Sequence, residues 1–346
     1  MQADTNCPAN PPESRISSVN RGGFARVAQG QSYTGIVQGY DRLRDSAAWL
    51  DISGRGKIRV TGEDRARFLH AMTTNHIQQL SPGTGCYAFL LTAQGRVLAD
   101  VNVLCLPDSF LLDTEPQTLE KTLAHLDSFI IADDAALQDL TPSLATIAVE
   151  GPESFRVLSA IGVPALKDHY GANVEWGSAL VARLTITGSS GFFIIVPGAE
   201  KDTILRMIEA AGVASADEEA FRVVRLEHGK PRYGEDIGER YLAQEANQPD
   251  ALHFQKGCYL GQEVVERLRS RGLITRVLKP LEIEGQRPPE PGTRLQAGDV
   301  PAAVITSAVY SPALAEVVAL AYVRVQFATS GTELAAGELH GRVRDP

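Results

Sequence analysis

Cysteine is scarce in this chain, and its scarcity excludes several kinds of site. The 346 residues contain four cysteines, at positions 7, 86, 105 and 258, and no two of them form a Cys-x-x-Cys pair. We therefore expect neither a closed zinc site nor an iron–sulfur cluster held by four cysteines of one chain. A disulfide framework is also not expected, because such frameworks belong to short, cysteine-dense secreted domains.

The sequence also lacks long apolar runs and an excess of basic charge. No apolar stretch approaches the roughly 20 residues that span a bilayer, and the first 40 residues contain no secretory apolar core. The formal net charge is −9, whereas an obligate nucleic-acid binder is basic. We expect no membrane and no direct nucleic-acid partner, and a cytoplasmic location. Arg15, Arg21 and Arg26 leave an organelle transit peptide, and hence an organelle matrix, as the alternative.

Hydrophobic periodicity divides the chain into an irregular arm and an α+β protein with a β-rich C-terminal part. Residues 1–45 are rich in Pro, Gly and Ser and show no sustained period. Residues 46–271 repeat strand and helix patterns in two rounds, about 46–150 and 151–271, which indicates paired α+β subdomains. Residues 272–346 contain six short alternating segments between Pro and Gly turns, a pattern typical of a small antiparallel barrel or sandwich.

The octet at residues 256–263, Lys-Gly-Cys-Tyr-Leu-Gly-Gln-Glu, combines a thiol with unusual neighbours. Cys258 lies two residues after Lys256, and a nearby cation or the free N–H groups of a following helix stabilise a thiolate. We therefore expect Cys258 to be reactive. The alternative is a buried, inert cysteine, the commonest state of a free thiol. A cysteine hydrolase would need a histidine partner, and His253 is the close candidate.

Two other segments carry polar residues in places that suggest ligand binding. In the expected strand 97–104, period two puts Asp100 and Asn102 on one face among aliphatic residues. That face either lines a polar pocket or is the wet face of a sheet. In the segment 225–236, Arg225 suits bidentate recognition of a carboxylate. A solvated cluster of salt bridges is the alternative for this segment.

The octet resembles the signature of the YgfZ-type branch of the glycine cleavage T-protein (aminomethyltransferase) superfamily. That branch comprises folate-binding factors that support the assembly or repair of iron–sulfur clusters. The resemblance spans about residues 46–340. Similar patterns occur at residues 68–87, at Arg225-Leu226-Glu227 with Gly229, and at residues 305–312.

The resemblance implies two ferredoxin-like subdomains and a barrel around a folate site, with tetrahydrofolate or a derivative as the cofactor. It implies no metal bound by the chain itself, and iron–sulfur client or assembly proteins as partners. The residues that it implies for the folate are Asp100, Arg225, Tyr87, Asn75 and Glu227. Those that it implies for the functional thiol site are Cys258, Lys256, Tyr259, Gln262 and Glu263.

Two positions depart from the pattern of the aminomethyltransferases. Ala99 stands where that enzyme carries the first of two aspartates, so that Asp100 alone remains, and Ser189 replaces a glutamate that contacts the pterin. Our main hypothesis is therefore a folate-binding accessory factor for iron–sulfur proteins that acts on client proteins through Cys258. The alternative is a folate-dependent aminomethyltransferase or a related one-carbon transfer enzyme.

Overall fold

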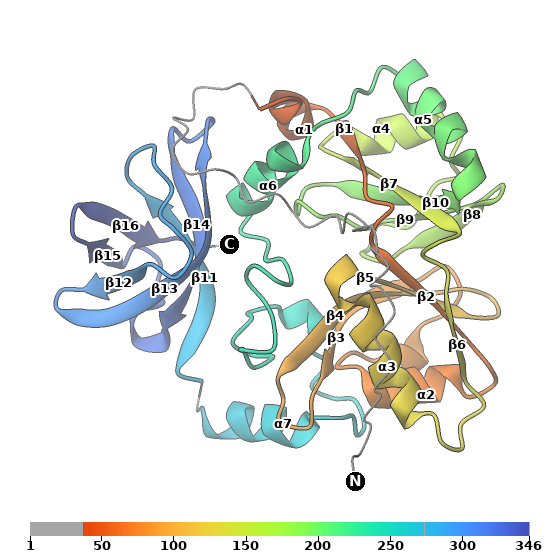
Figure 1. Cartoon of the computed structure of the whole chain (residues 1–346), viewed down its shortest axis with the longest axis horizontal. Helices are drawn as coiled ribbons and strands as arrows, with labels where there is room; N and C mark the ends of the chain where they lie inside the picture. Colours follow the sequence, from red (N-terminus) through yellow and green to blue (C-terminus); the bar gives the residue numbers. More distant parts are fainter. Residues whose placement is uncertain (1–36, 273, 346) are drawn as a thin grey trace, which may run out of the picture. The chain divides into compact units, whose positions relative to one another are not determined.

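Two five-stranded antiparallel sheets and a closed barrel make up the computed structural model, which describes residues 37–272 and 274–345 (Figure 1). Cys7 and the three arginines of the possible transit peptide lie outside the described residues. The expected α+β class with an antiparallel C-terminal barrel is confirmed. Within the described part of the chain, no helix combines the length and the apolarity needed to cross a membrane.

The first sheet is covered on one face by two helices, α2 and α3. Its strands, in spatial order, are β3 (Gly85–Leu91), β4 (Val97–Cys105), β5 (Phe110–Thr114), β2 (Gly56–Thr61) and β6 (Ala136–Asp139). Helix α2 (Arg65–Met72) buries Phe68 and Leu69 in a core that Leu126 of α3 (Leu119–Phe129) completes. A 3-10 turn at Pro116–Thr118 precedes α3. Proline suits its first position, because the ring fixes φ near the helical value and the backbone N–H that proline lacks would have no partner there.

The second sheet interleaves with the first along the chain. Its strands, in spatial order, are β1 (Ala48–Asp51), β7 (Leu144–Glu150), β10 (Gly191–Pro197), β9 (Ala179–Ala182) and β8 (Asn173–Trp176). Helices α4 (Ser154–Ala160) and α5 (Lys201–Ala210) pack on one face through Leu158 and Ile208. Because β1 and β7 precede residue 151 but pair within this sheet, the two sheets are not consecutive halves of the core.

Helix α6 (Glu218–Glu227) connects the second sheet to the barrel through a shared core. Asp217 caps its first turn by accepting a hydrogen bond of 2.9 Å from the backbone N–H of Ala220. Phe221 and Leu226 are buried with residues of β10, β13 and β14. A short helix α1 (Tyr40–Asp45) packs in the same core, so residues 40–45, which we expected to be irregular, are helical.

All six expected C-terminal segments are strands, and they close into a barrel. In order around the barrel they are β11 (Arg276–Ile283), β14 (Glu316–Arg324), β13 (Val300–Ser311), β12 (Arg294–Ala297), β15 (Glu333–Ala336) and β16 (Leu339–Val343). In β14, Val317 and Ala319 fill the barrel, whereas Val318 and Leu320 pack on the core that contains α6. Both faces of β14 are therefore buried, which explains its uninterrupted apolar run.

Candidate functional site

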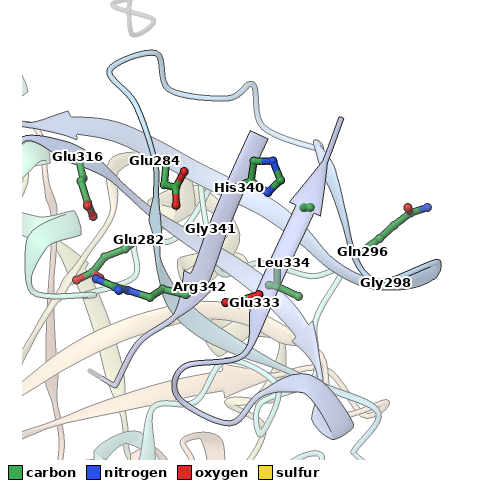
Figure 2. Close-up of a pocket in the computed structure, with 11 residues that line it drawn as sticks. Glu282, Glu284, Gln296, Gly298, Glu316, Glu333, Leu334, His340, Gly341 and Arg342 are labelled. Carbon is green, nitrogen blue, oxygen red and sulfur yellow. The ribbon is translucent and has the colours of Figure 1, made fainter. Parts of the chain in front are cut away.

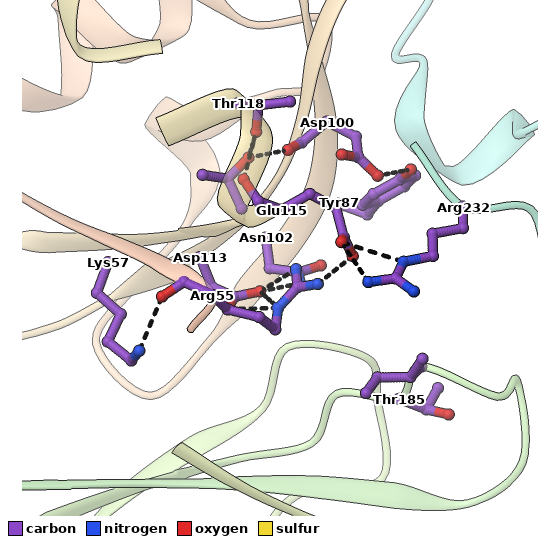
Figure 3. Close-up of polar contacts among 12 residues, drawn as sticks. Arg55, Lys57, Tyr87, Asp100, Asn102, Asp113, Glu115, Thr118, Thr185 and Arg232 are labelled. Carbon is purple, nitrogen blue, oxygen red and sulfur yellow. Dashed lines mark hydrogen bonds and ion pairs between the residues drawn. The ribbon is translucent and has the colours of Figure 1, made fainter. Parts of the chain in front are cut away.

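Buried charged side chains gather on the face of the first sheet that lies opposite α2 and α3. We call the following residues the polar cluster, most of which Figure 3 shows: Arg55, Tyr87, Asp100, Asn102, Asp113, Glu115, Tyr170 and Arg232. Asn102 is 7% exposed, Asp113 1% and Glu115 5%. The hypothesis of a wet sheet face is therefore wrong, because these groups are withdrawn from water.

The pairing register of the strands places the residues of the polar cluster side by side. Tyr87 of β3 lies opposite Asn102 of β4, which lies opposite Asp113 of β5, and Asp113 in turn lies opposite Lys57 of β2. Directly opposite residues of antiparallel strands share a face with their Cβ atoms about 5 Å apart. A single row of polar side chains thus crosses four strands.

Two arginines and two carboxylates of the cluster neutralise one another. Arg55 donates to Asp113 at 2.7 and 2.9 Å and also to Glu115, and Arg232 donates to Glu115 at 2.9 and 3.1 Å. Burial alone would raise the pKa of Glu115, but Arg55 and Arg232 outweigh it and lower that pKa. Both carboxylates are therefore hydrogen-bonded partners of arginine, and Glu115 is held in its ionised form.

Asp100 is the carboxyl group of the polar cluster that takes no part in these ion pairs. The hydroxyl of Tyr87 donates to its Oδ2 at 2.8 Å, whereas its Oδ1 is buried and has no hydrogen-bond partner among the residues that the structure describes. Burial, with the negative charge of Glu115 in addition, raises the pKa of Asp100 to about 6. A carboxyl group with a pKa near neutrality and one free oxygen can accept or donate a proton at physiological pH.

Tyr170 completes the cluster. It lies on the loop before strand β8 of the second sheet. Its hydroxyl donates to Asn102 Oδ1 at 2.5 Å, and Asn102 Nδ2 donates to Asp113 at 2.7 Å. The following Gly171 requires the absence of a side chain, because a Cβ there would lie 2.5 Å from the backbone of Gly85. This close backbone contact holds the Tyr170 loop against the first sheet.

Arg225 does not have the position that we expected for an anion anchor. It is 2% exposed, and its guanidinium donates to the carbonyl of Lys230 at 2.8 Å, to Asp236 at 2.7 Å and to Glu235. Its hydrogen-bonding groups are therefore used inside the protein. Val224 and Leu226, which precede and follow Arg225, are also buried, so this turn of the helix is surrounded by protein.

Glu227 and Asn75 also have structural partners in place of the ligand contacts we expected. Glu227 accepts hydrogen bonds from Tyr40 and from Ser311 (2.5 Å for the latter), so it joins α1, α6 and β13. The amide of Asn75 donates to the carbonyls of Tyr87 (2.8 Å) and Asp250 (2.7 Å). Of the five expected folate residues, Asp100 and Tyr87 lie together in the cluster.

Lys256 of the octet is turned into the protein, where it caps helix α2. Its Nζ donates to the carbonyls of His70 (2.6 Å), Thr73 (2.5 Å) and Asn75 (2.8 Å). Carbonyls at a helix C-terminus lack intrahelical partners, and a cation there is favourable. Lys256 therefore anchors the octet on α2, and its ammonium is not directed at the thiol as we expected.

The remaining octet residues shape an exposed loop that ends in helix α7 (Gln262–Arg271). Gly261 has φ +83°, and a Cβ there would lie 2.6 Å from the carbonyl of Thr92. The backbone N–H of Tyr259 donates to Gln262 Oε1 at 3.2 Å, and Glu263 lies in the first turn of α7. Cys258 itself is exposed, so the hypothesis of a buried cysteine is wrong.

Asn75 connects the octet to the polar cluster. Its carbonyl accepts from Lys256, and its side chain donates to the backbone of Tyr87. His253 contacts the ring of His76, at 5.1 Å between centroids, and is thereby directed to a histidine and not to Cys258. Within the described residues, no group of His, Cys, Asp or Glu side chains is arranged to hold a metal ion.

Sequence reasoning missed Arg55, Asp113, Glu115 and Arg232. The strand β5 was not predicted, although Asp113 closes the apolar run Phe110–Leu112 and is therefore a carboxylate at a buried position. Arg55 lies in a turn, and its role depends on a partner 58 residues away. Asp113 could have been found from the sequence, because it is a polar residue at the end of an apolar strand. No comparable sequence pattern indicated the roles of Arg55 and Arg232.

A hollow of about 350 Å³ lies on the barrel and shares no residue with the polar cluster (Figure 2). Four glutamates line it, Glu282, Glu284, Glu316 and Glu333. Arg342 neutralises one of them, Glu282, at 2.7 Å. The hollow is therefore acidic, unlike the charge-balanced arginine–carboxylate network of the cluster.

Comparisons with known proteins agree with this architecture. Residues 18–256 match the family described as GCVT N-terminal domain, and residues 276–344 match the glycine cleavage T-protein C-terminal barrel domain. An aminomethyltransferase of Rubrobacter xylanophilus is 32% identical over 310 residues, which cover 87% of this chain and 82% of that protein. A putative chloroplastic transferase of Arabidopsis thaliana is 24% identical over 327 residues, 93% of this chain and 75% of that protein.

A solved structure shows the same fold. The glycine cleavage system aminomethyltransferase T of Bartonella henselae superposes with a TM-score of 0.82 at 22% identity, over 90% of this chain and 89% of that one. None of these descriptions mentions the YgfZ-type branch, so that finer assignment stays a prediction. Two matched domains and a relative at 32% identity show that the chain belongs to the glycine cleavage T-protein family.

Proposed function

We propose that the protein is a folate-dependent one-carbon transfer enzyme of the aminomethyltransferase type, with Asp100 as its proton-exchanging group. The observation that carries this proposal is the buried Asp100 carboxyl group with a free Oδ1 and a pKa near neutrality. The names of the relatives support the same choice, since they are aminomethyltransferases. They give no support to the iron–sulfur role that we preferred from the sequence.

The polar cluster fits a reduced folate. A free, buried carboxyl oxygen is a hydrogen-bonding partner for the N–H groups of a pterin, and its isolation would be costly without a ligand. Bound tetrahydrofolate would supply the amine that accepts a one-carbon unit. Asp100 would bind this group through Oδ1, and Tyr87 would hold the carboxyl group in place through Oδ2.

The other cluster residues keep the site in one arrangement and one charge state. Arg55 and Arg232 lower the pKa of Glu115 and so favour its ionised form, and the oxygens of Asp113 are occupied by hydrogen bonds from Arg55 and Asn102. Buried groups with fixed partners need little reorganisation when charge moves nearby. Asp100 is therefore the member of the cluster best suited to take up a proton from the folate amine and return it.

The test is the isosteric variant Asp100→Asn, assayed for methylene-tetrahydrofolate formation from an aminomethyl donor, a transfer that releases ammonia and needs no oxidant. Loss of a general acid–base group lowers turnover by about 10²- to 10⁴-fold. Tetrahydrofolate binding should change much less, because the amide keeps the shape and one hydrogen-bonding oxygen. Asp299→Asn, at an exposed aspartate of the barrel, is the matched control. A wild-type protein without turnover and without tetrahydrofolate binding would overturn the proposal.

A second candidate function rests on the exposed thiol of Cys258. The octet holds this thiol at the surface of a loop that Lys256 and Gly261 fix in position, which one-carbon transfer does not require. A folate-binding accessory role toward iron–sulfur client proteins would use such a thiol. Cys258→Ser should then abolish the rescue of iron–sulfur enzyme activity in cells that lack the protein, without lowering its melting temperature. Full rescue by this variant would refute the candidate role of the thiol.

A further inference from the structure

Lys230 brings an ammonium group to the polar cluster from the side of the second sheet. Its Nζ donates to the carbonyl of Thr185 at 2.6 Å and lies 5.8 Å from the ring centroid of Tyr170, a member of the cluster. Figure 3 shows Thr185 on the loop that faces Arg55 and Arg232. Lys230 therefore belongs to the surroundings of Asp100, although it comes from the segment after α6.

Lys230 is half-buried and makes fewer hydrogen bonds than the two buried lysines, Lys57 and Lys256. An ammonium group has three N–H donors. Lys256 directs its donors to three carbonyls and Lys57 to two, those of Ser53 and Arg55. In the described part of the chain, Lys230 has Thr185 as its single acceptor. Two N–H groups of Lys230 are therefore available to water or to a ligand.

The charge of Lys230 is also not paired directly. The nearby carboxylate of Glu150 is fully buried and accepts from the backbone N–H groups of Ile186 (2.5 Å) and Thr187 (3.0 Å) and from the hydroxyls of Thr185 and Thr187. No ion pair joins Lys230 to any residue that the structure describes. Glu150 thus acts on Lys230 at a distance while its own oxygens are occupied.

Burial and four charged groups determine the ionisation of Lys230. Burial lowers its pKa to about 8, Glu150 and Asp100 act in the opposite direction, and Arg55 and Arg225 act in the same direction as burial. The group is therefore charged at pH 7 and loses its proton in mildly alkaline solution. An anion bound to it would raise the pKa again.

We propose that Lys230 is an anion subsite that binds a carboxylate of the ligand held by the polar cluster. This inference rests on the proposed function, because it assumes that a ligand occupies the cluster beside Asp100. It gives to Lys230 the anion-anchoring role that the sequence had suggested for Arg225, five residues earlier. The carboxylate has two possible sources, the benzoylglutamate part of a folate and the carboxylate of a small amino acid bound beside it.

The experiment compares three ligands by calorimetry at pH 7. Tetrahydrofolate carries the benzoylglutamate, 6-methyltetrahydropterin has the same ring system without any carboxylate, and sarcosine represents a small amino acid. The variants are Lys230→Gln, whose amide keeps a donor for Thr185, and Lys230→Arg, which keeps the charge. Lys279→Met, at a lysine of barrel strand β11, is the control.

Loss of one charge-assisted hydrogen bond should weaken binding of the anchored carboxylate by about 10- to 100-fold. If the folate supplies the carboxylate, K230Q weakens tetrahydrofolate by that factor and leaves 6-methyltetrahydropterin unchanged. If a small amino acid supplies it, K230Q weakens sarcosine binding and leaves tetrahydrofolate binding unchanged. K230R and K279M should bind within a few-fold of wild type in either case.

The failures of the subsite and of the proposed function are distinguishable. If wild type binds tetrahydrofolate and K230Q binds all three ligands equally well, the subsite is wrong and the folate site stands. If wild type binds none of them, the proposed function fails and the subsite with it. If K230Q does not fold, titrations of wild type and K230R at pH 7 and pH 9.5 decide. Affinity for the anchored ligand should fall with pH in wild type alone, and equal behaviour of the two would overturn the subsite.

Discussion

At the scale of single residues, the polar cluster separates stability from function. Its arginines and most of its carboxylates stabilise each other, whereas Asp100 is buried with half of its carboxyl group unsatisfied. Its folded-state pKa of about 6 lies above the ordinary value of 3.8. The folded protein therefore binds a proton at Asp100 more tightly than the unfolded chain does. Ionising this group opposes folding, which is typical of residues kept for activity.

The pH dependence of stability tests this interpretation. Between about pH 4 and pH 6 the native state binds more protons at Asp100 than the unfolded state, so the contribution of this residue to stability falls as the pH rises through that window. Asp100→Asn removes this effect. We expect the variant to be more stable than wild type at pH 7, by up to about 3 kcal/mol, and equally stable below pH 4.

Urea unfolding at pH 4 and pH 7 measures the difference, with Asp299→Asn as the control for a surface aspartate. A variant that is less stable than wild type at pH 7 would mean that the Asp100 carboxylate has a partner in the native state. The same variant loses turnover in our proposal, so a gain of stability and a loss of activity are expected together.

At the scale of elements, the octet is first a connection between α2 and the loop before α7. Lys256 satisfies three carbonyls at the end of α2 and lies 4.7 Å from the ring centroid of Tyr259. Burial lowers the pKa of Lys256 to about 7, but the three carbonyls and the negative end of the helix favour its charged form. The spacing of the octet thus serves to dock the loop as well as to display Cys258.

Lys256→Met should destabilise the protein by about 3 kcal/mol or more, because three buried carbonyls lose their donor. Lys279→Met, at a half-buried lysine that has no ion pair with any described residue, should change stability by less than about 0.5 kcal/mol. Thermal or urea unfolding provides the measurement. An unchanged stability of the Lys256 variant, together with slower alkylation of Cys258, would instead support the sequence-based view that this lysine activates the thiol.

At the scale of the whole described chain, one buried carboxylate joins the α+β core to the barrel. Asp236 is fully buried and accepts from Arg225 (2.7 Å), from the backbone of Arg232 (3.0 Å), and from Thr306 and Ser307 of β13 (2.6 Å each). The hydroxyl of Tyr322 donates to its carbonyl at 3.0 Å. Arg225 is thus part of this junction, which explains its burial.

Asp236→Ala should cost about 3–5 kcal/mol, because it removes a charged partner of the buried Arg225 guanidinium and leaves the buried hydroxyl of Ser307 without its acceptor. We also expect lower cooperativity, with the tryptophan fluorescence of the second sheet (Trp49 and Trp176) and far-UV circular dichroism no longer changing together during denaturant unfolding. Asp299→Ala, at an exposed position of the same barrel, should behave as wild type. A single sharp transition at the wild-type midpoint would show that the junction is held by apolar packing alone.

The sequence by itself determined the elements whose signal is local. Alternation and turn residues predicted all six barrel strands, and the stripe Leu119, Leu123, Leu126 and Ile130 predicted α3. Period two placed Asp100 and Asn102 on one face of a strand. These features depend on neighbouring residues alone, so a pattern of a few residues contains them. The family resemblance added the overall architecture, because it compares the chain over nearly its whole length.

Only the tertiary structure decided which polar groups meet. Register aligned Tyr87, Asn102, Asp113 and Lys57 in one row, and register is a property of strand pairs distant in sequence. Long-range partners gave Arg225 and Lys256 structural roles where local composition had suggested a ligand anchor and a thiol partner. Charged side chains bond to whichever opposite charge or carbonyl the fold brings within about 3 Å. The residues adjacent in the sequence do not determine which groups come that close.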